Sequence, residues 1–299
     1  MSNRRRMASF VTTTTLRSIR PRLQFAALTH ELPALVEGLK SIGVGTIIDF
    51  AREHRPAKES ARVAEVIATR MHEFPSAMHA VKLSALGIEE NHETAAAHMR
   101  NIAARAATLG TSVCVDAEEN ALHGNYSKTA FDLMRDYNTG ARAASGYPTV
   151  FKTYQMYRAD AVDELTRDIE IAKSTGFALG AKLVRGAYLR VDRNSGALLP
   201  DKAAVDKSFE KGLGITLEDA NDHVTTLVAT RNIANIEQAL EHENGDRCVY
   251  AQLLGMDDET TNRLLQEAPG SVLKYVPFGS IVELSPYLYR RLLERMSWS

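Results

Sequence analysis

The stretch GVGTIIDFAREHRPAKES, residues 43–60, decides between the two folds that the rest of the sequence allows. Its first part, VGTIIDF (44–50), is almost continuously apolar, which is typical of a strand buried on both faces of a parallel sheet. An open, doubly wound sheet normally has a glycine-rich phosphate loop directly after its first strand. The segment that follows here, AREHRPAKES (51–60), contains no glycine. The stretch therefore favours a closed barrel over the doubly wound sheet.

Seven further apolar runs repeat this pattern, at residues 78–86, 111–117, 149–154, 178–188, 224–230, 248–255 and 271–278. Between them, apolar residues recur every three or four positions and indicate amphipathic helices, for example at 57–74, 91–110, 159–176, 233–245 and 257–268. Three of these segments end near a glycine that we expect to act as a C-cap: Gly110, Gly176 and Gly245. Eight strand–helix units in about 250 residues predict a single (β/α)8 barrel of the TIM type, an α/β fold.

The overall composition of the 299 residues is that of a globular protein, with 44% hydrophobic and 24% charged residues. A net charge of −1 gives no electrostatic reason to expect nucleic-acid binding. Cys114 and Cys248 lie in apolar runs, so we interpret them as buried thiols in a reducing compartment, and we expect no metal site. No apolar stretch is long enough to span a bilayer.

The first residues differ from the rest of the chain. Residues 1–22 contain six arginines with many serines and threonines, and the first acidic residue is Glu31. This composition matches a mitochondrial transit peptide, a disordered basic leader or an ordered first segment of the fold. We therefore divide the chain into a basic leader, residues 1–29, and a single barrel domain, residues 30–299.

Charged residues lie where the predicted strands end, which is where the active site of a (β/α)8 barrel is built. Lys82 lies inside an apolar run, where an unpaired charge is costly. Asp116 ends the next run along the chain, so the two side chains could pair, either as a structural ion pair or as part of a catalytic group.

The cationic residues form two groups. One follows the expected strands four to six and suits a phosphate-bearing ligand: Lys152, Lys182, Arg185 and Arg231. The other is the adjacent pair Arg290 and Arg291 on the expected last helix. Two cationic zones on one barrel indicate a phosphate-bearing cofactor on one side and a small anionic substrate on the other.

Seven blocks of sequence together resemble the proline dehydrogenase family: VKLSALG (81–87), VDAEEN (115–120), VFKTYQMYRAD (150–160), GAKLVRGAYL (180–189), VATRN (228–232), AQLLGM (251–256) and KYVPFGSIVELSPYLYRRLLE (274–294). They occur in the order of the family and extend over most of the chain from about residue 40. The resemblance implies a (β/α)8 barrel that binds FAD without a Rossmann motif. It also implies oxidation of L-proline to Δ1-pyrroline-5-carboxylate, with hydride passing from C5 of proline to N5 of the flavin and electrons passing on to a quinone or another acceptor.

The resemblance assigns substrate-binding roles. Arg290 and Arg291 match the pair that clamps the proline carboxylate, and Lys82 matches a lysine near the substrate that pairs with Glu294. The remaining substrate contacts implied are Tyr275, Tyr287 and Leu253. Tyr275 implies proline as the substrate, because related hydroxyproline enzymes have a small residue at that position.

The resemblance also assigns catalytic and cofactor-binding roles. The catalytic residues implied are Lys82, Asp116, Lys182 and Tyr275. Lys182 matches a basic residue near flavin N5 and Arg185 one that binds the FAD phosphates. The full cofactor-binding set implied is Asp116, Lys152, Gln155, Lys182, Val184, Arg185, Gly186, Ala187, Tyr188, Thr230, Arg231, Asn232 and Gln252.

Two other functions remain open from the residues alone. Arg231 stands where the family has histidine, which keeps open a weakened family member that binds flavin or an imino acid as a sensor. An unrelated aldolase with Lys82 or Lys182 as a Schiff-base lysine would need a lysine without a carboxylate partner. The resemblance further implies peripheral membrane contact, at the matrix side of the mitochondrial inner membrane in a eukaryote and otherwise at the cytoplasmic face of the membrane.

Overall fold

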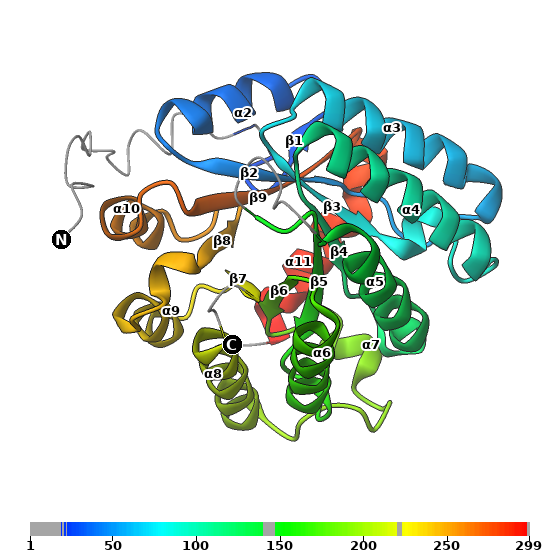
Figure 1. Ribbon diagram of the computed structural model, residues 1–299. Helices are drawn as coiled ribbons and strands as arrows, with labels where there is room; N and C mark the ends of the chain where they lie inside the picture. The colour runs from blue at the N-terminus through cyan, green and yellow to red at the C-terminus, as the bar shows by residue number, and fades with distance from the viewer. Residues whose placement is uncertain (1–18, 20, 22, 140–146, 220–222, 298–299) are drawn as a thin grey trace.

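The computed structural model describes residues 19, 21, 23–139, 147–219 and 223–297, with side chains as far as Arg290 (Figure 1). Eight strands follow one another around a parallel sheet: β2 (Gly45–Phe50), β3 (Met78–Lys82), β4 (Val113–Asp116), β5 (Val150–Gln155), β6 (Leu179–Val184), β7 (Val224–Val228), β8 (Val249–Leu253) and β9 (Val272–Gly279). Because β9 pairs with both β8 and β2, the sheet closes on itself. The predicted (β/α)8 barrel is confirmed, and each of the eight strands lies within one of the eight apolar runs or overlaps it.

The alternation of side chains along each strand separates two apolar layers. Ile47, Cys114 and Phe151 belong to a small cluster inside the barrel. Val115 and Val150 belong to a much larger cluster between the strands and the helices. Each is next in sequence to one of the interior residues and therefore points to the opposite face of its strand. Whether a polar residue faces the barrel interior or the helix layer therefore depends on its position in this alternation.

Helices surround the barrel (Figure 1). Those that the sequence predicted are α3 (Ser60–Glu73), α4 (His92–Leu109), α6 (Ala161–Thr175), α9 (Ile233–Glu241) and α10 (Asp258–Glu267). Gly110 and Gly176 cap α4 and α6 in the left-handed conformation, as expected. Gly245 does not cap α9, which ends at His242 in an extended conformation. The structure adds α2 (Leu32–Ser41), α5 (His123–Tyr137), the short α7 (Leu189–Asp192) and α8 (Lys202–Glu218).

The folded chain begins earlier than the predicted boundary at residue 30. The short strand β1 (Ala27–Leu28) pairs with the end of β9, and Ala27 is buried. The barrel sheet therefore includes residues that the sequence analysis placed in the basic leader. Most of that leader, residues 1–18, 20 and 22, lies outside the described residues.

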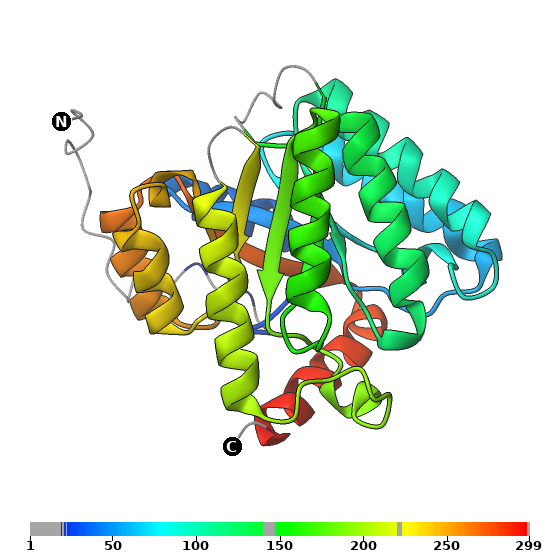
Figure 2. The same cartoon turned by 60° about the horizontal axis from the view of Figure 1, so that its bottom comes forward.

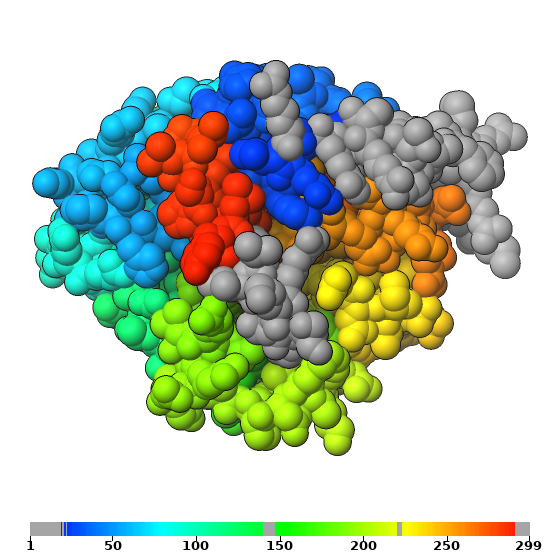
Figure 3. Space-filling view, turned by 180° about the vertical axis from the view of Figure 1, so that it is seen from behind, coloured from blue at the N-terminus to red at the C-terminus, as the bar shows by residue number. Residues whose placement is uncertain are grey.

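The last helix, α11 (Ile281–Ser297), crosses the end of the barrel toward which the strands point (Figure 2). It begins with a capping box: Ser280 N donates to Glu283 Oε2 over 2.7 Å, and Glu283 N donates to Ser280 Oγ over 3.3 Å. From behind, α11 appears between the N-terminal segment and the loops of the central strands (Figure 3). Across the described part of the chain, every helix is too short or too polar to span a membrane.

Candidate active site

A buried polar cluster occupies the carboxyl end of the barrel interior. Asp116 ends β4, and its carboxylate accepts hydrogen bonds from Lys182 Nζ on β6 (2.5 Å) and from the Tyr275 hydroxyl on β9 (2.6 Å). The amine of Lys182 also lies 4.8 Å from the centre of the Tyr275 ring. Three residues predicted to be catalytic thus meet in one contact group, although 159 positions separate Asp116 from Tyr275.

Lys82 joins this group through a partner that the sequence analysis missed. Its amine donates to both carboxylate oxygens of Asp49, at 2.7 and 2.6 Å, and lies 3.4 Å from the Tyr275 hydroxyl. The predicted direct pair between Lys82 and Asp116 does not form. The predicted partner Glu294 has its side chain outside the described residues. Asp49 was detectable in TIIDF, because it follows Ile47 by two positions on the inward face of β2.

The charges of the cluster set the protonation of its members. Burial alone would raise the pKa of Asp116, but the charges of Lys182 and Lys82 outweigh burial and hold that pKa below its ordinary value. Burial raises the pKa of Asp49 and prevails over the nearby Lys82. For Lys82, burial would lower the pKa, but Asp49 and the other nearby carboxylates raise it. Both lysines therefore have carboxylate partners, unlike the unpaired lysine of the aldolase alternative.

Glu53, in the loop after β2, contacts α11 at the mouth of the barrel. Both terminal nitrogens of Arg290 donate to the carboxylate of Glu53, Nη2 at 2.6 Å from Oε1. The Arg290 guanidinium lies 4.8 Å from the centre of the Tyr188 ring, and the Tyr188 hydroxyl donates to Glu53 Oε1 over 3.3 Å. Tyr287, one turn earlier on α11, is buried. The side chain of Arg291 lies outside the described residues.

Glu53 is the second residue of the site that the sequence analysis missed. Burial would raise its pKa, but the hydrogen bond from Arg290 and the charge of Lys82, 3.9 Å away, lower it. Glu53 is therefore ionised at neutral pH and pairs with both terminal nitrogens of Arg290. No sequence motif identifies this pair, because its members are 237 positions apart.

The predicted phosphate-binding zone lies after β6 and β7. Arg185 donates to Asp206 Oδ1 (2.9 and 3.1 Å), Thr230 Oγ1 (2.5 Å) and Asn235 Oδ1 (2.8 Å). Asn232 caps the N-terminus of α9, which begins at the same place. Arg231 is exposed beside it. The Arg185 guanidinium is thus held by several hydrogen bonds next to the positive end of the α9 helix dipole.

Two residues predicted to bind the cofactor are placed elsewhere. The amine of Lys152 donates to Glu164 (2.7 Å) and Asp168 (2.6 Å) in the helix layer outside the barrel, and it is 1% exposed. Gln252 accepts a hydrogen bond from Thr261 on α10 (2.7 Å). Both follow the outward alternation of their strands, so neither prediction is correct. By the same alternation, Gln155, Val184 and Leu253 have the inward positions of β5, β6 and β8.

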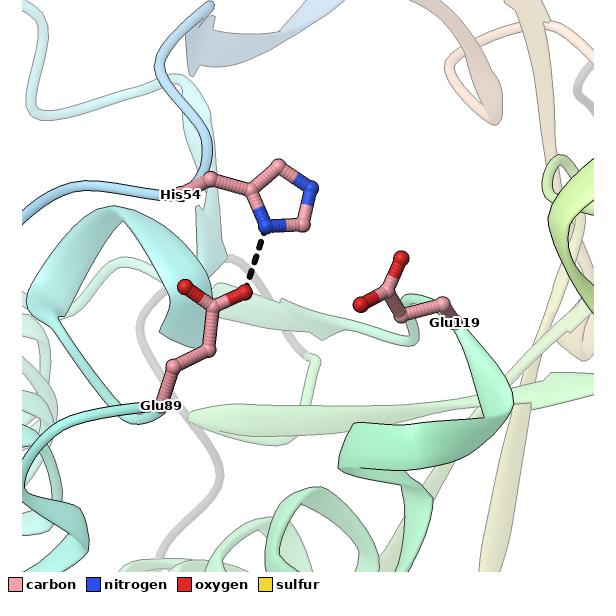
Figure 4. A group of neighbouring side chains, drawn as sticks. All are labelled: His54, Glu89 and Glu119. Atoms are coloured by element: carbon pink, nitrogen blue, oxygen red, sulfur yellow. Dashed lines mark hydrogen bonds and ion pairs between the residues drawn. The ribbon is translucent and has the colours of Figure 1, made fainter.

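Another charged group lies beside the mouth. The ligand atoms of His54, Glu89 and Glu119 are all within 4.8 Å of one another, and His54 Nδ1 lies 2.5 Å from Glu89 Oε1 (Figure 4). Burial would lower the pKa of His54, but the hydrogen bond and charge of Glu89 raise it. The contact between the His54 ring and the Glu89 carboxylate joins the loop that carries Glu53 to the segment after β3.

The fold and the site together define a barrel enzyme with paired buried charges at the carboxyl ends of its strands. The model of the proline dehydrogenase family matches residues 34–299, so the chain belongs to the proline dehydrogenase family.

Individual relatives agree with this family. The human mitochondrial proline dehydrogenase 1 is 34% identical over 212 residues, which are 66% of this chain and 34% of that protein. The mouse hydroxyproline dehydrogenase is 31% identical over 253 residues, 78% of this chain and 54% of that protein. The chain therefore spans about a third to a half of the length of these relatives.

Solved structures of the same fold include proline utilization A from Bdellovibrio bacteriovorus, inactivated by N-propargylglycine. It superposes with a TM-score of 0.76 over 93% of this chain and 32% of that one, at 16% identity. A bifunctional proline utilization A gives 0.74 over 91% of this chain and 30% of that one, at 21% identity. At these identities the likeness concerns the fold alone.

Proposed function

We propose that this chain is an FAD-dependent proline dehydrogenase that oxidises L-proline to Δ1-pyrroline-5-carboxylate. The observation that carries the proposal is the buried cluster of Lys82, Asp116, Lys182 and Tyr275 at the mouth of the barrel, directly beneath Arg290 on α11. The family membership supports the same reaction.

Arg290 provides the first half of a carboxylate clamp, and the adjacent Arg291 provides the second. A guanidinium binds a carboxylate through paired, charge-assisted hydrogen bonds, and Arg290 binds Glu53 in this manner. The carboxylate of proline takes the place of Glu53 on Arg290. Lys82 adds a further positive charge nearby, and Asp49 fixes the direction of its amine.

Tyr275 provides a wall of the substrate site. Its hydroxyl is fixed by Asp116, and its ring lies between the two lysine amines, 4.8 Å from Lys182 and 6.0 Å from Lys82. This buried ring fills space that the hydroxyl of hydroxyproline would need. The site therefore prefers proline over hydroxyproline.

The residues after β6 and β7 fit a flavin dinucleotide. Arg185 and the N-terminus of α9 form the donor set that phosphate groups require, and Lys182 offers a cation from the inward face of the barrel. Lys182, Arg185, Thr230 and Asn232 would hold FAD, which would accept the two electrons of the reaction in the form of a hydride. The role of the protein is to bind proline and exclude water around it.

The electron acceptor of this reaction is a quinone or another oxidant, reached through peripheral contact with a membrane. Relatives named as mitochondrial proline dehydrogenases support a mitochondrial location in a eukaryote. The protein then acts at the matrix side of the inner membrane, and in a prokaryote at the cytoplasmic face of the membrane.

The visible spectrum of the purified protein, recorded anaerobically with and without L-proline, tests the proposal. We expect flavin absorption that bleaches on addition of proline, and much less bleaching with hydroxyproline. Absorption that does not bleach would indicate a flavin-binding sensor. A colourless protein that cannot be reconstituted with FAD would contradict both functions.

A further inference from the structure

Asp192 is a buried carboxylate outside the cluster described above. It is 3% exposed and ends α7, the short helix after β6. Its Oδ2 accepts a hydrogen bond from the Tyr157 hydroxyl (2.6 Å), and its Oδ1 accepts one from the backbone N of Asn120 (2.8 Å). Tyr157 follows β5 and Asn120 follows β4. One side chain therefore ties together the loops of three consecutive strands at the mouth.

Tyr157 is the surface against which the loop after β6 folds. Its backbone N donates to the carbonyl of Arg185 (2.8 Å). A Cβ atom added to Gly186 would lie only 1.9 Å from the Tyr157 ring, and Gly186 has φ +133. Gly186 is thus a glycine because the chain passes directly over this ring in a conformation that other residues rarely adopt.

The same loop ends at Tyr188, which contacts the substrate arginine. The backbone N of Asp192 donates to the carbonyl of Tyr188 (2.9 Å), and the Tyr188 ring lies against Arg290. The Asp192 side chain therefore acts on the loop through Tyr157, and the backbone of the same residue closes the turn that follows Tyr188.

We propose that Asp192 is a positioning residue for the segment Arg185–Tyr188, and that it sets the place of Tyr188 against Arg290. This role rests on the proposed function, because Arg290 is taken to bind the substrate carboxylate. Tyr188 contacts a binding group and not a reacting atom. Displacing it weakens substrate binding in the ground state and in the transition state alike, so KM rises while kcat per bound flavin changes little.

Steady-state kinetics with proline test this role. Asp192→Ala is expected to raise the KM for proline by about tenfold, the size of effect that the loss of one charge-assisted hydrogen bond produces. The kcat per bound flavin is expected to stay within about threefold of wild type. Asp192→Asn is expected to stay within about twofold, because its amide can accept from Asn120 and donate to the Tyr157 oxygen. Tyr157→Phe should lie between the two. Tyr137→Phe is the matched control, since its hydroxyl contacts the carbonyl of Arg100 on the far helix layer.

Hydrogen exchange of the purified full chain separates this proposal from the proposed function. Asp192→Ala and Tyr157→Phe are expected to speed amide exchange in residues 185–192, and Tyr137→Phe is not. If exchange is unchanged, or if it is faster while KM stays at the wild-type value, the positioning role is wrong. If Asp192→Asn is as damaging as Asp192→Ala, hydrogen bonding is not the mechanism and the proposal is also overturned. If the wild-type protein does not oxidise proline, the proposed function fails, while faster exchange still supports the positioning of the loop.

Discussion

Replacement of Asp49 by asparagine tests whether the buried pair with Lys82 organises the barrel mouth. Breaking one partner of a buried ion pair generally costs about 3–5 kcal/mol, because the other charge stays buried without compensation. Asp49 is fully buried and contacts Lys82 through both oxygens. Glu53, 3.9 Å from the Lys82 amine, compensates part of the loss. We therefore expect Asp49→Asn to lower the free energy of unfolding by about 3 kcal/mol.

The measurement is urea unfolding of the full chain, followed by circular dichroism. Asp132→Asn is the matched control: Asp132 also pairs with a lysine at 2.7 Å, but the side chain of Lys128 is 71% exposed. An exposed pair of this kind contributes at most about 1 kcal/mol. The double variant Asp49→Asn/Lys82→Met removes both charges and should be less destabilised than the sum of the single variants, with a coupling of about 2 kcal/mol. Equal effects of Asp49→Asn and Asp132→Asn, or an additive double variant, would refute the reasoning.

Three further predictions follow from individual residues. Burial lowers the pKa of His79 from 6.5 to about 4, so the contribution of His79 to stability is complete above pH 6.5 and is lost as the pH falls toward 4. The unfolding free energy of His79→Gln, measured by urea titration at each pH, should therefore fall by about 3 kcal/mol less across this window than that of the wild type. Gly186→Ala should reduce both thermal stability and flavin retention, because the added methyl group would collide with the Tyr157 ring. Gly124→Ala is the control: this helical position has open space around it, and the variant should gain about 0.5–1 kcal/mol of stability in the same thermal assay. Lys152→Met should cost about 3 kcal/mol in unfolding free energy, because it removes the lysine charge that Glu164 and Asp168 share, yet it should leave the KM for proline unchanged. A raised KM with intact stability would restore Lys152 to the cofactor site.

The positions of the strands could be predicted from the sequence, but the direction of each side chain could not. Strands of a (β/α)8 barrel are buried on both faces, so apolar residues occupy both positions of the alternation. In β5, Phe151 faces the interior and Val150 faces the helices, and nothing in the run VFKTYQ distinguishes the two. Lys152 and Gln252 were assigned to the wrong face for this reason. Asp116, Lys182 and Tyr275, which the resemblance identified individually, lie together inside the barrel, and their catalytic roles stay predictions.

The partners of the site residues could not be predicted either. Lys82 was expected to bind Asp116 or Glu294, and it binds Asp49. The choice depends on where the closure of the barrel places β2 between β3 and β9, and this is a property of the whole sheet. Glu53 was not identified at all, because its interaction with Arg290 joins the first loop of the barrel to the last helix.

Under the proposed function, the substrate carboxylate and Glu53 compete for Arg290. Among the described side chains, the cluster contains three carboxylates and three cations: Asp49, Glu53, Asp116, Lys82, Lys182 and Arg290. A substrate carboxylate on Arg290 adds a fourth negative charge to these six groups, and it must share the Arg290 guanidinium with Glu53 unless Glu53 leaves. The Asp49 side chain is 1% exposed, whereas Glu53 is 13% exposed and comes from a loop at the rim. Release of Glu53 into solvent therefore costs the least. In the proposed function, binding of the anion to Arg290 is then an exchange of one carboxylate for another on that guanidinium.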